Sequence, residues 1–139
     1  LGNLESKRDW GDAQDFVKAV WLMMQQEKPI DYVVASGETH SIREFVEGAL
    51  TSASIPFDAV ENTNFFTGDQ PALAYTLKNE PETPLVYVNP KYFRPAEVQL
   101  LLGDPTRIKE ELGWIPTVSF EKLVDNMTQH DILTLSTKL

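Results

Sequence analysis

The chain has 139 residues, and its 12 Lys and Arg against 21 Asp and Glu give a formal net charge of −9. This length is typical of one domain, and the excess of carboxylates argues against nucleic-acid binding, which depends on Lys and Arg that neutralise phosphates. The absence of cysteine excludes disulfides and thiolate nucleophiles, and no apolar run approaches the roughly 18 residues of a membrane span. We therefore expect a cytoplasmic protein that binds neither nucleic acid nor a membrane.

The first predicted element is a helix over residues 12–27, capped by Asp9 or Asp12 and closed before Pro29. Its apolar positions recur at helical spacing and are Ala13, Phe16, Val17, Val20, Trp21 and Met24. Residues 31–36, with the sequence DYVVAS, contain β-branched and aromatic side chains and predict a buried strand.

A second helix is predicted to begin after Ser41, because Ser41 and Glu44 have the spacing of a capping box. Residues 52–84 have weak periodicity and several prolines, which predict a long irregular insertion with a short strand near residues 57–60. Residues 85–89 predict another strand, and two further helices are predicted after Asp104 and after Ser119. Gly113 is expected to end the third helix. These elements predict a small mixed α/β fold.

The sequence contains no Gly-x-Gly-x-x-Gly dinucleotide fingerprint, phosphate-binding P-loop or Gly-x-Ser-x-Gly nucleophile motif. Basic residues in an acidic chain are the stronger signal: Arg8 and Arg94 lie in segments with aromatic neighbours, and their forked donors suit a diphosphate. Glu97, close to Arg94, could accept hydrogen bonds from sugar hydroxyls. Arg43 lies in the first turn of a helix, where a bound anion would offset its charge. The alternative for each arginine is a structural ion pair or a solvated side chain.

Four blocks of the sequence resemble, in the same order, the C-terminal half of the GDP-mannose 4,6-dehydratases, which are extended short-chain dehydrogenase/reductases. The blocks are LGNLESKRDWG at residues 1–11, GETHSIREFV at 37–46, PKYFRPAEV at 90–98, and LLGDPT with LGWIP between 101 and 116. The resemblance implies a C-terminal nucleotide-sugar-binding domain over residues 1–139, without most of the Rossmann half. Asp12 departs from the family pattern, which has histidine there, and residues 55–84 do not resemble the expected insertion.

The resemblance also implies an activity for the whole enzyme: conversion of GDP-mannose to GDP-4-keto-6-deoxymannose by internal NADP-mediated hydride transfer and loss of water. It assigns Arg8 and Arg94 to the diphosphate and Glu97 to the ribose, with Asn3, Lys7 and Arg43 as further substrate-binding positions. The catalytic and NADP-binding residues of the family have no counterpart here, so the 139 residues alone are expected to be inactive.

Homo-oligomers are expected from the same resemblance. Two alternatives stay open at this point: another epimerase or reductase acting on a nucleotide sugar, and a non-catalytic interaction subunit.

Overall fold

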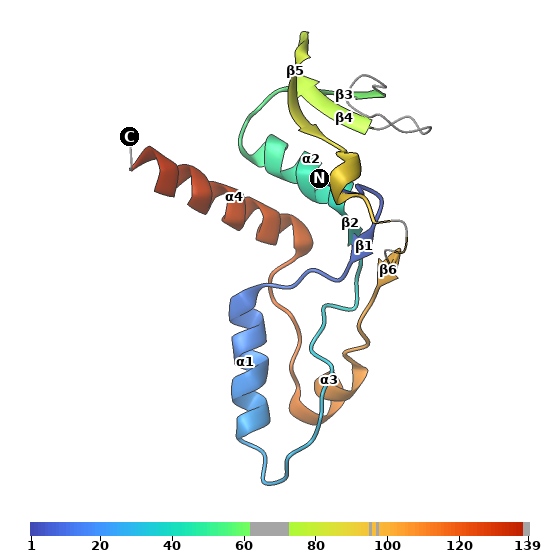
Figure 1. Cartoon of the computed structure of the whole chain (residues 1–139). Helices are drawn as coiled ribbons and strands as arrows, with labels where there is room; N and C mark the ends of the chain where they lie inside the picture. The colour runs from blue at the N-terminus through green and yellow to red at the C-terminus, as the bar shows by residue number, and fades with distance from the viewer. Residues whose placement is uncertain (62–72, 95, 97, 138–139) are drawn as a thin grey trace.

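The computed structural model describes residues 1–61, 73–94, 96 and 98–137. Figure 1 shows an elongated molecule in which one three-stranded sheet with α2 lies at one end and α1 with α3 at the other. Between them a second small sheet, which we call the waist sheet, has the strand order β2-β1-β6, with β1 at Lys7–Arg8, β2 at His40–Ser41 and β6 at Leu100–Leu101. The predicted mixed α/β class is therefore confirmed.

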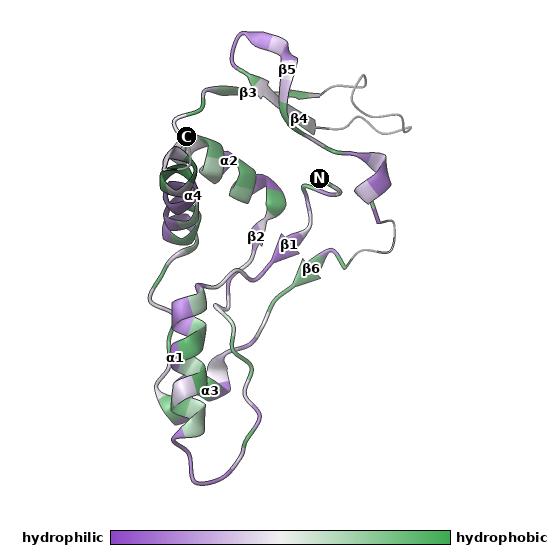
Figure 2. Cartoon of the chain, turned by 60° about the vertical axis from the view of Figure 1, so that its left-hand side comes forward, coloured by the Kyte–Doolittle hydropathy of each residue, from purple (hydrophilic) through white to green (hydrophobic). Residues whose placement is uncertain are grey.

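Helix α1 spans Ala13–Met24, and the Asp12 carboxylate caps it by accepting from the backbone N–H groups of residues 14 and 15. Its inner face packs in a cluster around Ala19, Ile108 and Trp114. Part of the predicted apolar stripe lies on the opposite face, where the exposed large hydrophobic side chains are Val17, Val20, Trp21 and Met24. Figure 2 shows hydrophobic residues along much of this helix.

Helix α2 spans Ile42–Ser52, and both hydrogen bonds of the predicted capping box are present between Ser41 and Glu44. Bonds donated by the Ser41 backbone and hydroxyl hold the pKa of the Glu44 carboxyl below its usual range. Helix α2 packs against α4 (Phe120–Ser136), which Ser119 caps as predicted. Helix α3 (Thr106–Leu112) ends at Gly113, whose φ of 67° is the left-handed conformation expected there.

The prediction of an irregular insertion over residues 52–84 is wrong where the structure describes this segment. Strands β3 (Phe57–Glu61), β4 (Leu73–Leu77) and β5 (Glu80–Tyr87) form an antiparallel sheet, which includes the short strand expected near residues 57–60. Pro81 and Pro84 obscured β5, but this strand lies at the sheet edge, where a missing N–H is tolerated. Residues 62–72 lie outside the described part of the chain.

The predicted strand over residues 31–36 does not form a ladder in the described structure. The backbone N–H of Ser36 donates to the Asp9 carboxylate at 2.7 Å instead of to a neighbouring strand. The prediction that this run is buried is wrong for most of it: Ala35 is buried against the chain near Gly103, but Val33 is 54% exposed and the other residues of the run are exposed or half-buried. Its periodicity could not identify a missing strand partner, because strand pairing is a non-local property.

Candidate functional site

A cavity of about 310 Å³ lies where the N-terminal segment, the start of α2 and the 3₁₀ turn Pro90–Tyr92 come together. We call it the N-terminal cavity. Its described lining residues include two aliphatic side chains and three cations, and they are Leu1, Gly2, Asn3, Ser6, Arg8, Ile42, Lys91, Tyr92 and Arg94.

Arg8 reaches this cavity from the central strand of the waist sheet. Strand β1 pairs antiparallel with β2 and parallel with β6, and Arg8 lies opposite His40 and Leu101. Its Nη1 donates to the carbonyl oxygens of Lys7 at 2.8 Å and Val98 at 2.9 Å. These bonds fix the guanidinium group at the cavity wall, because both acceptors belong to ordered backbone next to the sheet.

Arg94 comes to the same cavity from the segment that follows the 3₁₀ turn. The Asn89 side chain caps this turn by accepting from the Lys91 N–H at 2.9 Å, and the Asn89 N–H donates to the Leu1 carbonyl at 2.7 Å. Gly2 permits the close approach of the two segments, because a Cβ there would lie 2.3 Å from the Tyr92 carbonyl oxygen. The turn and the N-terminal segment therefore form one wall.

Of the other predicted site residues, only Asn3 is among the described residues that line the N-terminal cavity. Asn3 lines the cavity, and its Oδ1 accepts from the Glu5 N–H at 2.8 Å. Lys7 and Arg43 are absent from the described lining; Lys7 neighbours Arg8 on a strand, where successive side chains point to opposite faces. Glu97 lies outside the described residues.

Arg43 lies in the first turn of α2, where its positive charge is unfavourable, and it has a structural partner. Its guanidinium group forms an ion pair with the Glu5 carboxylate. A hydrogen bond to Glu5 raises the pKa of Arg43 above its usual value, with burial opposing the shift. The anion that offsets this cation at the start of α2 is thus a side chain of the protein itself.

The electrostatic character of the N-terminal cavity differs from that of the whole chain. Three cations, Arg8, Lys91 and Arg94, line it, and no carboxylate does so among its described lining residues, although the chain carries a net charge of −9. Two guanidinium groups and an ammonium group can donate many hydrogen bonds at once and match the oxygens of adjacent phosphates. The arrangement therefore suits a polyanionic ligand.

Lys91 and Tyr92 are cavity residues that the sequence did not single out. Their signal was the run of basic and aromatic residues around Arg94, but only the contact with residues 1–3 shows that they belong to this wall. The Lys91 Nζ lies 5.8 Å from the centroid of the Tyr92 ring. This distance fits a cation–π contact between the two side chains.

The part of the chain that the structure describes contains neither a metal-binding cluster nor a membrane-spanning helix. No group of three or more His, Cys, Asp or Glu is placed there to hold a metal ion. Among the same residues, no helix is long and apolar enough to cross a membrane.

Comparison with known proteins gives a consistent result. A family model described as GDP-mannose 4,6 dehydratase matches residues 1–127. The chain is 47% identical over 132 residues to GDP-mannose 4,6 dehydratase of Drosophila melanogaster, covering 95% of this chain and 31% of that protein. It is 42% identical over 139 residues to that of Homo sapiens, covering 99% and 35%. The chain therefore spans about a third of the length of these curated relatives.

Two solved structures have a similar fold over most of this chain. RMD from Pseudomonas aeruginosa, complexed with NADPH, superimposes with a TM-score of 0.64 at 19% identity, covering 93% of this chain and 34% of that one. UDP-glucose 4-epimerase from Thermotoga maritima, with UDP-glucose, gives 0.66 at 19% identity, covering 97% and 34%. At this identity the likeness establishes the fold alone.

Proposed function

Because the chain belongs to the GDP-mannose 4,6-dehydratase family, we propose that it supplies the nucleotide-sugar-binding portion of an enzyme that converts GDP-mannose to GDP-4-keto-6-deoxymannose. The resemblance drawn from the sequence blocks is confirmed by the family match. One observation in the structure carries the assignment of the site: Arg8 and Arg94, far apart in sequence, line the same cavity. This is the juxtaposition that a diphosphate clamp requires.

In this proposal the two guanidinium groups bind the diphosphate, and Lys91 adds a third positive charge at the same wall. Asn3 lies beside them, and Glu97 is proposed to accept hydrogen bonds from the ribose. Substrate contacts by Lys7 and Arg43 stay predictions. Binding energy from the nucleotide would hold the hexose in a fixed orientation, which lowers the barrier to reaction elsewhere in the enzyme.

NADP is the cofactor expected for the complete reaction, in which it supplies a hydride acceptor and donor. The residues of this chain do not fit a dinucleotide site, because the sequence lacks the Gly-x-Gly-x-x-Gly fingerprint. We therefore assign cofactor binding to the portion of the relatives that lies outside the matched third, and we expect no turnover from these 139 residues alone. Homo-oligomer formation and a cytoplasmic location also stay predictions.

Isothermal titration calorimetry of the 139-residue chain with GDP tests the clamp. Replacing Arg8 or Arg94 with Ala is expected to weaken GDP binding about 10- to 100-fold, because each removes charge-assisted hydrogen bonds of about 1.5–3 kcal/mol. Arg107→Ala is the matched control, since Arg107 pairs with Glu111 on α3 and is absent from the described cavity lining. Unchanged GDP affinity in the Arg8→Ala/Arg94→Ala double variant would refute the proposal.

A further inference from the structure

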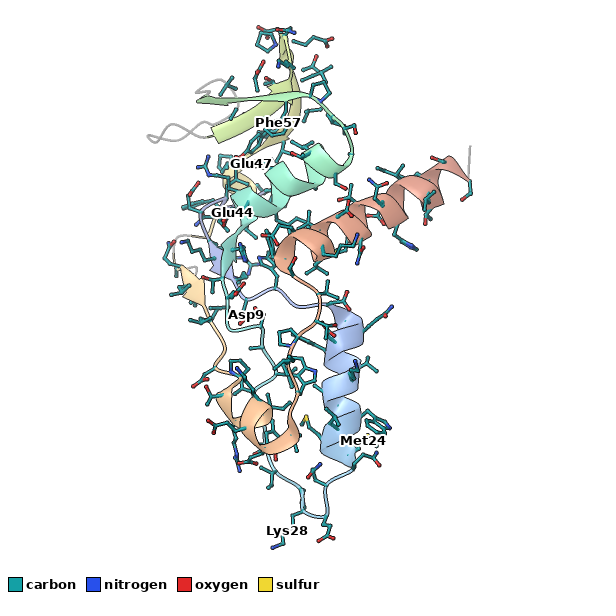
Figure 3. The ribbon with its side chains drawn as sticks, turned by 180° about the vertical axis from the view of Figure 1, so that it is seen from behind. Asp9, Met24, Lys28, Glu44, Glu47 and Phe57 are labelled. Atoms are coloured by element: carbon teal, nitrogen blue, oxygen red, sulfur yellow. The ribbon has the colours of Figure 1, made fainter. Side chains whose placement is uncertain are left out.

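Asp9 directly follows Arg8, and its carboxylate accepts hydrogen bonds from two other segments of the chain. Oδ1 accepts from the Ser36 N–H at 2.7 Å, and Oδ2 accepts from the Gly37 N–H at 3.0 Å and the Gly103 N–H at 3.3 Å. Figure 3 shows Asp9 in the middle of the molecule, where the chain leaves β1. One side chain thus joins β1 to residues 36–37 and to the segment after β6.

These segments are in close contact beside Asp9. A Cβ added at Gly103 would lie 2.2 Å from the Cβ of Ala35, so the two backbones can approach only because residue 103 is glycine. Gly37 has a φ of +82°, a conformation that favours glycine, and its N–H and that of Ser36 both donate to the Asp9 carboxylate. An ionised carboxylate only accepts hydrogen bonds and therefore suits three converging donors.

The contact with Gly103 bears directly on Arg8. Arg8 donates to the Val98 carbonyl at 2.9 Å, just before β6, and the ladder between β1 and β6 is only two residues long. Such a short ladder fixes the position of its partner weakly. The Lys7 N–H donates to the Gln99 carbonyl at 2.8 Å on the Val98 side of β6, and the bond from Gly103 to Asp9 attaches the same two segments on its other side. The Asp9 bond therefore helps to hold the segment that carries the acceptor of Arg8.

We propose that Asp9 is a positioning residue that sets the Arg8 guanidinium group in the N-terminal cavity without touching the ligand. The inference rests on the proposed function, since it assumes that Arg8 binds a diphosphate. Asn cannot replace Asp9, because its carboxamide has one acceptor oxygen and would direct an N–H₂ group at one of the backbone N–H donors. We therefore expect that replacing Asp9 removes selectively the contribution that Arg8 makes to ligand binding.

A double-mutant cycle in the 139-residue chain, read by calorimetry with GDP, measures this contribution. Asp9→Asn is expected to weaken binding about tenfold, in the lower range for residues that orient a ligand-binding group. In an Arg8→Ala background the same change is expected to have almost no further effect, because the group that it orients is gone. A purely structural role of Asp9 would instead weaken binding by the same factor in both backgrounds.

Asp15→Asn is the matched control. Asp15 is a buried carboxylate that also accepts three hydrogen bonds, but it joins α1 to residues 117–118 and is absent from the described cavity lining. The Asp15→Asn substitution is expected to lower the stability of the chain and to leave the GDP dissociation constant unchanged. If Asp9→Asn does not fold, Asp9→Glu takes its place in the cycle, since it keeps the charge and displaces the carboxylate.

The cycle separates the two levels of the proposal. If Arg8→Ala leaves GDP binding unchanged, the diphosphate clamp itself is wrong. If Arg8→Ala weakens binding but Asp9→Asn binds like the wild type, or if the two effects multiply, the clamp stands and the positioning role of Asp9 is overturned.

Discussion

The contact made by Asp15 gives a quantitative test of how α1 is held against the rest of the chain. Its Oδ2 accepts from the Thr117 and Val118 N–H groups at 2.7 and 3.0 Å, and its Oδ1 accepts from the Thr117 hydroxyl at 2.7 Å. The residue is 4% exposed. Burial opposes ionisation, but these hydrogen bonds and the charge of Lys18 outweigh it and hold the pKa of Asp15 below its usual value.

Asp15→Asn keeps the shape of the side chain and removes its charge. The carboxamide oxygen can still accept from both backbone N–H groups, while its N–H₂ group donates to the Thr117 hydroxyl, which can rotate. A hydrogen bond to a charged acceptor contributes about 1.5–3 kcal/mol and a neutral one about 0.5–1.5. When two or three bonds to a charged acceptor become bonds to a neutral one, the free energy of unfolding falls by about 2 kcal/mol at pH 7.

Urea denaturation followed by circular dichroism at pH 7, 5 and 3 measures this effect. A carboxyl whose pKa is lowered by folding stabilises the protein above its unfolded pKa of about 3.9 and loses that contribution as pH falls through the folded value. Asparagine does not titrate, so the gap between wild type and variant should be equal at pH 7 and 5 and smaller at pH 3.

The control for this experiment is Asp12→Asn, three residues earlier. Asp12 caps α1, and asparagine caps helices as well as aspartate does, so we expect a change within about 0.5 kcal/mol. The reasoning is wrong if Asp15→Asn matches the wild type at pH 7, or if its deficit is as large at pH 3 as at pH 7.

Two further predictions concern glycines and the outer face of α1. Gly103→Ala should destabilise the chain by about 1–3 kcal/mol, because the added Cβ would collide with Ala35. In Gly113→Ala the added Cβ meets no atom within 4 Å, so the free energy of unfolding should fall by only about 1 kcal/mol, the cost of the left-handed backbone. Thermal unfolding of the two variants measures the difference. Trp21→Gln and Met24→Gln, at side chains 59% and 76% exposed, should each change the free energy of unfolding by less than about 0.5 kcal/mol in urea titrations. A larger loss would mean that this face is packed.

The helices were predictable because the signals that begin and end them are local. Asp12, Ser41 and Ser119 each accept from backbone N–H groups within their own first turn, and Gly113 adopts the positive φ that ends α3. Such bonds depend on residues two to four positions apart, which the sequence displays directly.

The strands were less predictable because each depends on a partner that is distant in the chain. The run at residues 31–36 has the composition of a strand, yet its end is held by Asp9. Conversely, β5 forms despite Pro81 and Pro84, because it is an edge strand whose pairing with β4 is irregular around Pro84. Composition indicates burial and extension, whereas pairing is decided by tertiary contacts.

The candidate site shows the same division between local and non-local information. The chemistry of Arg8 and Arg94 could be inferred from residue type, and the family resemblance joined them as one clamp. Lys91 became a candidate only because Gly2 lets the N-terminal segment approach the turn that carries it. The sequence offered Asp9 as a possible helix cap, a local role, whereas its carboxylate accepts hydrogen bonds from backbone that is distant in the chain. In our proposal Asp9 acts through the backbone segments that it joins, and its own charge does not face the ligand.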